Sequence, residues 1–170
     1  MSTVPPDIRV TVDNLLRVDK VPAGHARWVD EHREGDMRML YPLLVEGEIS
    51  DANLLVIAYP RSPSLRFRVN LLYGRAIWRL DYVADEEHVN SFNRPDGLIL
   101  GPFTCPHFHS WTDNRRFATK ITLPDRLENA RILEAKLQTF PNVFRWFCGE
   151  TNIVISEVKI PELPKSDRML

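Results

Sequence analysis

Three neighbouring segments in the middle of the chain place the strongest constraint on its fold. Residues 54–59 are continuously apolar, which is typical of a central strand buried on both faces. Residues 65–70 alternate between apolar and polar side chains, and residues 76–83 return as a further strand after a reversal at Gly74. These patterns predict an antiparallel meander of three strands.

The sequence on either side of the meander predicts further strands and several helices. Additional strands are expected at residues 26–30, 37–45, 106–111, 117–123 and 153–158. Pro42 interrupts the second of them, which favours an edge strand or a β-bulge. Helices are expected at residues 14–18, 127–137 and 140–148, with a strand as the open alternative for the first. This order indicates an α+β fold, a mainly antiparallel sheet with helices near the C-terminal part packing on one face.

The length and composition predict one domain. With 170 residues the chain can bury a core without disulfides, so we expect a single α+β domain at residues 8–160 between flexible tails at 1–7 and 161–170. No apolar run is long enough to cross a bilayer, and the N-terminus lacks the pattern of a signal peptide. The two cysteines have no close spacing, which argues against a disulfide framework or a structural zinc motif. We therefore expect a cytoplasmic protein with no membrane association.

Two short motifs form a candidate catalytic site if their strands pair. His107 and His109 are two positions apart in a predicted strand, so their side chains share a face. Arg79 and Asp81 obey the same rule in the strand at residues 76–83. Pairing would bring two imidazoles, a guanidinium and a carboxylate together. The plain alternatives are structural hydrogen bonds for the histidines and an ion pair between Arg79 and Asp81, worth about 0–1 kcal/mol if exposed.

The meander contains arginines but no acidic residue between Leu54 and Leu80. Its five arginines are Arg61, Arg66, Arg68, Arg75 and Arg79. The net charge of the whole chain is only −1, so these side chains predict a local basic surface on a near-neutral protein. Solubilising charge on the open face of the sheet is one explanation. A phosphate-bearing partner is the other, because guanidinium binds phosphate bidentately, and Arg66 and Arg68 are then the predicted substrate-binding residues.

A long irregular connection at residues 84–105 supplies a third histidine. Such loops are more often functional than idle, and the turn at residues 93–97 would bring His88 back toward the sheet, as a further substrate-binding residue. A metal at His107 and His109 would need a third ligand. If the loop folds back, that ligand could come from His88, Asp81, Glu86 or Glu87. We expect no metal and no other cofactor, with a metal-dependent enzyme as an alternative.

The order of these motifs resembles that of a widespread family of uncharacterised bacterial proteins. That family carries an Arg-x-Asp strand, a His-x-Asn-Pro-Asp-Gly turn and a Gly-Pro-His-x-His strand. The order is also similar, more distantly, to TumE-type toxins of toxin–antitoxin systems, with Arg-x-Asp, Pro-His-His and a later Pro-His-His-x-His. The segments that carry the resemblance lie within residues 52–123: Arg79-Leu80-Asp81, His88, Asn93-Arg94-Pro95-Asp96-Gly97 and Pro106-His107-Phe108-His109.

The chain departs from the family pattern at three points. Arg94 is an extra residue in the turn, residues 103–105 separate Gly101-Pro102 from the histidines, and His88 lies farther from the turn. The resemblance implies a toxin-like protein of a bacterium or mobile element that acts on RNA or another phosphate-bearing target.

On that resemblance, the activity would be that of a metal-independent ribonuclease. His107 and His109 would share the general acid and base roles, Arg79 would stabilise the charge of the reacting phosphate, and Asp81 would orient an imidazole or Arg79. The candidate partners are RNA and a protein such as an antitoxin. The alternative is a non-enzymatic binding or inhibitor protein, of the phage or mobile-element type, that grips a macromolecular partner.

Overall fold

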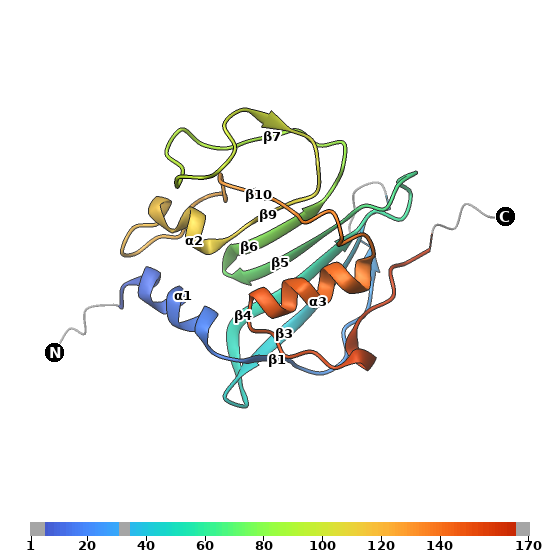
Figure 1. The fold of residues 1–170 in the computed structure, drawn as a ribbon. Helices are drawn as coiled ribbons and strands as arrows, with labels where there is room; N and C mark the ends of the chain where they lie inside the picture. Colours follow the sequence, from blue (N-terminus) through green and yellow to red (C-terminus); the bar gives the residue numbers. More distant parts are fainter. Residues whose placement is uncertain (1–5, 31–34, 166–170) are drawn as a thin grey trace.

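The computed structural model describes residues 6–30 and 35–165. Within them, an antiparallel sheet of eight strands runs in the order β1-β3-β4-β5-β6-β9-β10, and β2 pairs with β3 (Figure 1). These strands are β1 (Lys20–Pro22), β2 (Val29–Asp30), β3 (Met37–Val45), β4 (Glu48–Ala58), β5 (Phe67–Tyr73), β6 (Arg75–Tyr82), β9 (His107–His109) and β10 (Arg131–Ile132). The predicted α+β class with a mainly antiparallel sheet is confirmed.

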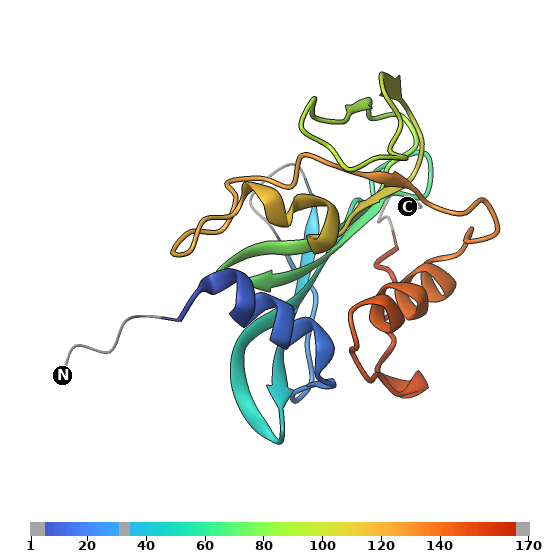
Figure 2. The same ribbon diagram turned by 60° about the vertical axis from the view of Figure 1, so that its left-hand side comes forward.

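The remaining elements lie around this sheet. They are α1 (Ile8–Arg17), the strand pair β7 (His88–Val89) and β8 (Pro102–Phe103), α2 (Trp111–Asn114), the 3-10 helices η1 (Arg115–Phe117) and η2 (Glu157–Lys159), and α3 (Phe140–Glu150). Figures 1 and 2 show α3 along one side of the sheet, with the segment of β7 away from it, beyond the β9 end.

The predicted meander is confirmed as β4, β5 and β6. Gly74, at a φ of 69°, makes the tight turn between β5 and β6. Glu46 and Gly47 both have positive φ and close the β3–β4 hairpin, a conformation whose twist matches that of the flanking strands. The pairing of β3 with β4 shifts register between Pro42 and Leu44, so the bulge predicted at Pro42 is present. The edge-strand alternative is wrong, because β1 pairs with the other side of β3.

Helix α3 packs on the sheet through a stripe of aromatic residues, and its prediction is confirmed. Its buried side chains at helical spacing are Phe140, Val143, Phe144 and Phe147. The Phe140 ring meets Phe67 of β5 edge-on at 4.9 Å, and the Phe147 ring meets Trp78 of β6 at 5.3 Å. Burying each such side chain is worth about 1.5–3 kcal/mol, so this contact joins helix and sheet in one core.

The prediction of a helix at residues 127–137 is wrong. Leu127 and Leu133 are buried, but the segment between them is extended and pairs with β9 through β10. Asn129 holds this path, because its backbone N–H donates to Asn114 Oδ1 and its own Oδ1 accepts from the backbone of Ser91. Tertiary hydrogen bonds and strand pairing therefore overrule a sequence rich in helix formers.

Several predicted boundaries are also corrected. The first helix is longer than predicted, because Asp7 caps it by accepting from the backbone N–H of Arg9. The strands predicted at 26–30 and 106–111 shrink to β2 and β9, and Ser110 ends β9 by capping α2. No strand forms at 117–123 or 153–158, both within the described residues, apart from a single bridge between Lys20 and Ile153.

The predicted tails are only partly described by the structure. Residues 1–5 and 166–170 lie outside the described residues. Glu162 accepts a hydrogen bond from Trp28 Nε1 at 2.9 Å, and Leu163 packs against the core. Residues 162–163 therefore belong to the packed body. The helices that the structure describes are all too short or too polar to span a bilayer.

Candidate functional site

Strands β6 and β9 pair as the two motifs predict. Arg79 lies opposite His109, and Asp81 lies opposite His107. On the other side of β6, Asp81 lies opposite Arg68 of β5. Side chains alternate along each strand, so these residues share the side of the sheet that faces away from α3. We call it the polar face of β5, β6 and β9: Arg68, Asn70, Arg79, Asp81, His107 and His109.

Asp81 is the centre of the polar face, with its side chain only 2% exposed. Its Oδ1 lies 2.7 Å from Arg68 Nε, and its Oδ2 lies 2.7 Å from Arg79 Nε. Its Oδ2 is also 3.2 Å from His109 Nε2 and 3.5 Å from His107 Nε2. Burial would raise the pKa of Asp81, but the His109 hydrogen bond and the arginine charges hold that pKa well below its usual range. Asp81 is therefore a carboxylate at neutral pH.

A third imidazole joins the polar face because the long connection does fold back. His88 lies in β7, which pairs with β8 so that His88 is opposite Phe103. The His88 ring centroid lies 5.0 Å from that of His107 and 4.8 Å from that of His109. We call His88, His107 and His109 the histidine cluster. Each offers one nitrogen, and these nitrogens all lie within 4.8 Å of one another.

Asn90 fixes the position of His88, and it is not among the site residues predicted from the sequence. Its Nδ2 donates to the carbonyls of Ile99 and Ala130, and its Oδ1 accepts from the backbone N–H of Ala130 at 2.6 Å. The same Oδ1 is 3.1 Å from His88 Nε2. In sequence, Asn90 is one of many polar loop residues, and no local pattern marks a contact that spans 40 positions.

His88 and His109 are neutral imidazoles at physiological pH. Burial lowers the pKa of His109 to about 4, although its hydrogen bond with Asp81 opposes the shift. Burial and the neighbouring His107 lower the pKa of His88 as well. A neutral imidazole is the form that accepts a proton or binds a metal ion.

Access to the cluster runs past Arg79 and His88. Both line a cavity of about 410 Å³ that is also bordered by Ser91, Arg126 and Glu128. Arg79 is 30% exposed, whereas the side chains of His107 and His109 are 3% and 0% exposed. A molecule in the cavity would therefore meet Arg79 and His88 first, with the other two histidines behind them.

The prediction of a local basic surface, made from the stretch between Leu54 and Leu80 that lacks acidic residues, is wrong. Acidic residues outside the stretch pair with the two predicted phosphate-binding arginines: Arg68 binds both Asp81 and Glu86, and Arg66 lies 3.7 Å from Asp85 and 3.8 Å from Glu86. The two guanidinium groups also lie over the Tyr59 ring. Arg66 and Arg68 are thus already occupied, which leaves Arg79 as the arginine of the polar face that lines the cavity.

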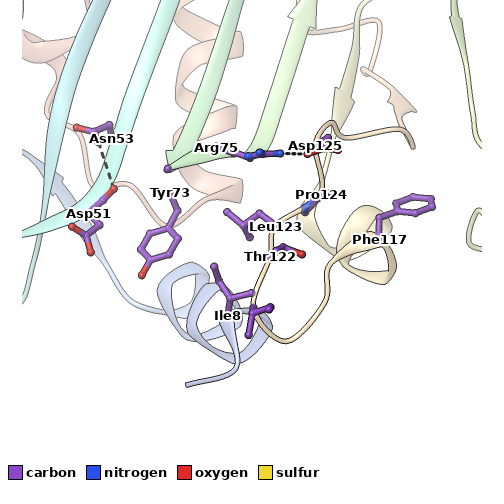
Figure 3. Close-up of a pocket in the computed structure, with 12 residues that line it drawn as sticks. Ile8, Asp51, Asn53, Tyr73, Arg75, Phe117, Thr122, Leu123, Pro124 and Asp125 are labelled. Atoms are coloured by element: carbon purple, nitrogen blue, oxygen red, sulfur yellow. Dashed lines mark hydrogen bonds and ion pairs between the residues drawn. The ribbon is translucent and has the colours of Figure 1, made fainter. Parts of the chain in front are cut away.

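A larger cavity, of about 1020 Å³, lies elsewhere on the molecule (Figure 3). It is formed where α1 and the segment before Asp125 approach the β5–β6 turn. Ile8, Tyr73 and Leu123 line it, and Arg75 pairs with Asp125 at its border. No residue of the polar face or of the histidine cluster lines this cavity. The candidate chemistry therefore belongs to the smaller cavity.

Comparisons of the chain with protein-family models, with curated proteins and with solved structures found no match. The resemblance to bacterial proteins and to TumE-type toxins stays a prediction that rests on the motifs themselves. The geometry of the polar face and of the cavity beside it is therefore the basis for a functional proposal.

Proposed function

We propose that this protein cleaves a phosphodiester bond, in RNA or another phosphate-bearing target, at the polar face and the histidine cluster. One observation carries the proposal: a guanidinium and an imidazole line one cavity while a buried carboxylate and two further imidazoles stand directly behind them. Phosphoryl chemistry needs a cation at the reacting phosphate and a group that moves a proton, and this arrangement offers both.

Arg79 is the proposed contact to the phosphate. Its Nε is bound to Asp81 at 2.7 Å, which fixes the plane of the guanidinium, and the side chain still reaches the cavity. Arg79 lines the cavity beside the histidine cluster, whereas Arg66 and Arg68 do not, so the earlier assignment of phosphate binding to them passes to Arg79. A pre-positioned guanidinium stabilises the developing negative charge without reorganisation.

The histidine cluster is the proposed site of proton transfer. In RNA, the 2′-hydroxyl would lose its proton to a neutral imidazole of the cluster and attack the adjacent phosphorus. The bond from phosphorus to the 5′ oxygen would then break as the cluster returns that proton to the 5′ oxygen, which leaves a 2′,3′-cyclic phosphate. The resemblance to TumE-type toxins implies this role for His107 and His109. Both are buried, so His88 is the imidazole that would meet the substrate. Such proton transfers contribute roughly 10²–10⁴-fold to rate.

The test is cleavage of a fluorescent single-stranded RNA by the purified full-length protein, beside growth inhibition on expression in a bacterial host. We expect Arg79→Ala and His88→Gln to lose roughly 10²–10⁴-fold in cleavage rate while the circular dichroism spectrum is kept. Arg75→Ala is the matched control, because Arg75 lies on the same strand but pairs with Asp125 at the other cavity. Wild-type protein without cleavage or growth inhibition, or His107→Ala/His109→Ala protein with full activity, would contradict the proposal.

A non-enzymatic binding role is the second candidate, and one observation favours it. The connection between β6 and β9 exposes large apolar side chains, of which Phe92 is 95% exposed; the others are Val89, Ile99 and Leu100. Exposed apolar residues in one loop are typical of a contact surface for a protein partner. Under this reading Phe92→Ser abolishes a complex seen on pull-down from the native host, whereas His88→Gln leaves it intact.

A further inference from the structure

We propose that the histidine cluster is a binding site for a divalent transition-metal ion, with Zn²⁺ as the best match. The proposal stands on the arrangement of His88, His107 and His109, and it does not rest on the proposed proton transfer. An imidazole nitrogen whose lone pair binds a metal ion cannot also accept a proton from the substrate. It replaces the expectation, drawn from the sequence, that the protein uses no metal.

The spacing of the three imidazoles suits one ion. Their offered nitrogens lie within 4.8 Å of one another, whereas ligands of a tetrahedral ion at ~2.0–2.1 Å are ~3.3–3.5 Å apart. His107 and His109 are fixed by the sheet, while His88 sits in a two-residue strand of the long connection. Binding of an ion would therefore require β7, with His88 and Asn90 together, to shift toward the other two histidines.

The hydrogen bond of His107 leaves its Nε2 available as a ligand. Its Nδ1 lies 2.8 Å from the carbonyl oxygen of Cys105, which can only accept, so Nδ1 carries the proton. In the neutral ring the lone pair is then on Nε2, which lies 3.5 Å from Asp81 Oδ2. Two electron-rich atoms this close in a buried site are stabilised by a cation beside them.

The same reasoning assigns the tautomer of His88. The Asn90 Nδ2 donates to the carbonyls of Ile99 and Ala130, which fixes the orientation of the amide and makes its Oδ1 an acceptor. His88 Nε2 must therefore donate to it, and the lone pair of the neutral ring is on Nδ1. A ligating histidine typically donates its second nitrogen in this way, to a carbonyl or carboxylate.

His109 supplies the independent sign of a missing ligand. Its Nδ1 is buried and is the only imidazole nitrogen within the described chain that is buried without a hydrogen-bond partner. Its Nε2 lies 3.2 Å from Asp81 Oδ2 and 2.8 Å from Arg79 Nη2, and it cannot both donate to the first and accept from the second. Arg79 can only donate, so donation from Nε2 to Asp81 requires the Arg79 Nη2 group to move off Nε2. That rearrangement would free Nδ1 for the metal and form a carboxylate–histidine–metal triad. The other tautomer leaves a buried N–H unpaired, at a cost of about 1–3 kcal/mol.

The donor set selects the kind of ion. Three imidazoles favour zinc, iron, cobalt or nickel over magnesium and calcium, which require oxygen ligands. Three protein ligands leave one position open, as in catalytic zinc sites. Neutral ligands do not cancel the charge of the ion, so the fourth ligand is expected to be anionic. Arg79, beside His109, would favour the same kind of ligand.

Metal binding by the purified full-length protein tests the proposal directly. After dialysis against chelator, the protein is titrated with Zn²⁺, Co²⁺ or Mg²⁺ alone and followed by calorimetry, by thermal unfolding, and by the visible bands of tetrahedral Co²⁺. We expect one Zn²⁺ or Co²⁺ per chain, a rise in Tm on binding, and no effect of Mg²⁺. His88→Gln and His109→Ala should lose the site, and Asn90→Ala should weaken it roughly 10–100-fold.

The control is His25→Ala, which removes an exposed histidine outside the cluster and should bind as the wild type does. Equal binding by His88→Gln and wild type, or no bound ion with no Tm shift in the wild type, overturns the site. The outcome is separate from that of the proposed function. If the protein binds Zn²⁺ but does not cleave RNA, the metal site is supported and the proposed ribonuclease activity is contradicted. If it cleaves RNA in the presence of chelator and binds no metal, the ribonuclease activity is supported and the metal site is contradicted.

Discussion

Both faces of strands β5, β6 and β9 contain fully buried side chains, but these are stabilised by opposite means. On the α3 side, Leu80 and Phe108 pair across the strands, and Phe108 stacks on Trp78 at 5.1 Å. On the polar face, one residue along each strand, Asp81 and His109 are just as inaccessible. Apolar burial is stabilising by itself, whereas burial of a charged or polar group costs free energy unless that group is paired. Apolar residues of similar volume can often replace a buried ion-pair network at little cost in stability, so stability alone does not account for this network.

The largest loss of folding stability is expected when Asp81, the shared partner at the centre of the polar face, is removed. Asp81→Ala leaves Arg68, Arg79 and His109 without their shared acceptor, and we expect a loss of about 3–5 kcal/mol in the free energy of unfolding at neutral pH. Urea denaturation measures it. Asp125→Ala is the matched control, because Asp125 also pairs with an arginine but is 93% exposed, and it should cost about 0–1 kcal/mol. Similar losses in the two variants would contradict the central role of Asp81.

A substitution on the apolar face should lower the folding stability by a comparable amount without affecting metal binding or RNA cleavage. Leu71→Ala removes a fully buried side chain of β5 and should cost about 2–5 kcal/mol, mainly through the cavity it leaves. We expect the folded variant to keep the metal affinity and the RNA cleavage of the wild type, because Leu71 does not touch the histidine cluster. A loss of metal binding in proportion to the loss of stability would mean that the two faces are not separable.

The dependence of stability on pH should also separate the faces. The folded pKa of His109 is lowered from 6.5 to about 4, so between these values the unfolded chain binds a proton that the folded protein does not. Stability is therefore complete above pH 6.5 and falls as the pH drops toward 4. Because His109 is fully buried, its slope approaches about 1.4 kcal/mol per pH unit.

Urea unfolding in the presence of chelator, at several pH values across this window, measures the slope. His109→Gln should flatten it, and the control His25→Gln should keep the slope of the wild type. An unchanged slope in His109→Gln would show that other groups cause the pH dependence.

The sequence predicts what local patterns control. The alternation of β5 and the reversal at Gly74 give the meander, and the spacing of Phe140, Phe144 and Phe147 gives α3. The shared face of Arg79, Asp81, His107 and His109 also follows from alternation, once β6 and β9 pair.

Long-range contacts set the features that the sequence could not predict. The path at residues 127–137 is fixed by Asn114 and Ser91, not by its own helix formers. His88 reaches the cluster because Asn90 binds Ala130, 40 positions away. The acids that neutralise Arg66 and Arg68 come from outside the stretch in which those arginines stand out.

X-ray absorption of the zinc-loaded, dialysed protein tests most directly whether the buried polar face is a functional site. The histidine cluster predicts one Zn²⁺ per chain with three imidazole nitrogens and one further light ligand, all at ~2.0–2.1 Å. It also predicts that His109→Ala loses the ion. A sulfur shell at ~2.3 Å would place the ion at a cysteine instead. That result, or dialysed protein with no zinc signal, would contradict the account.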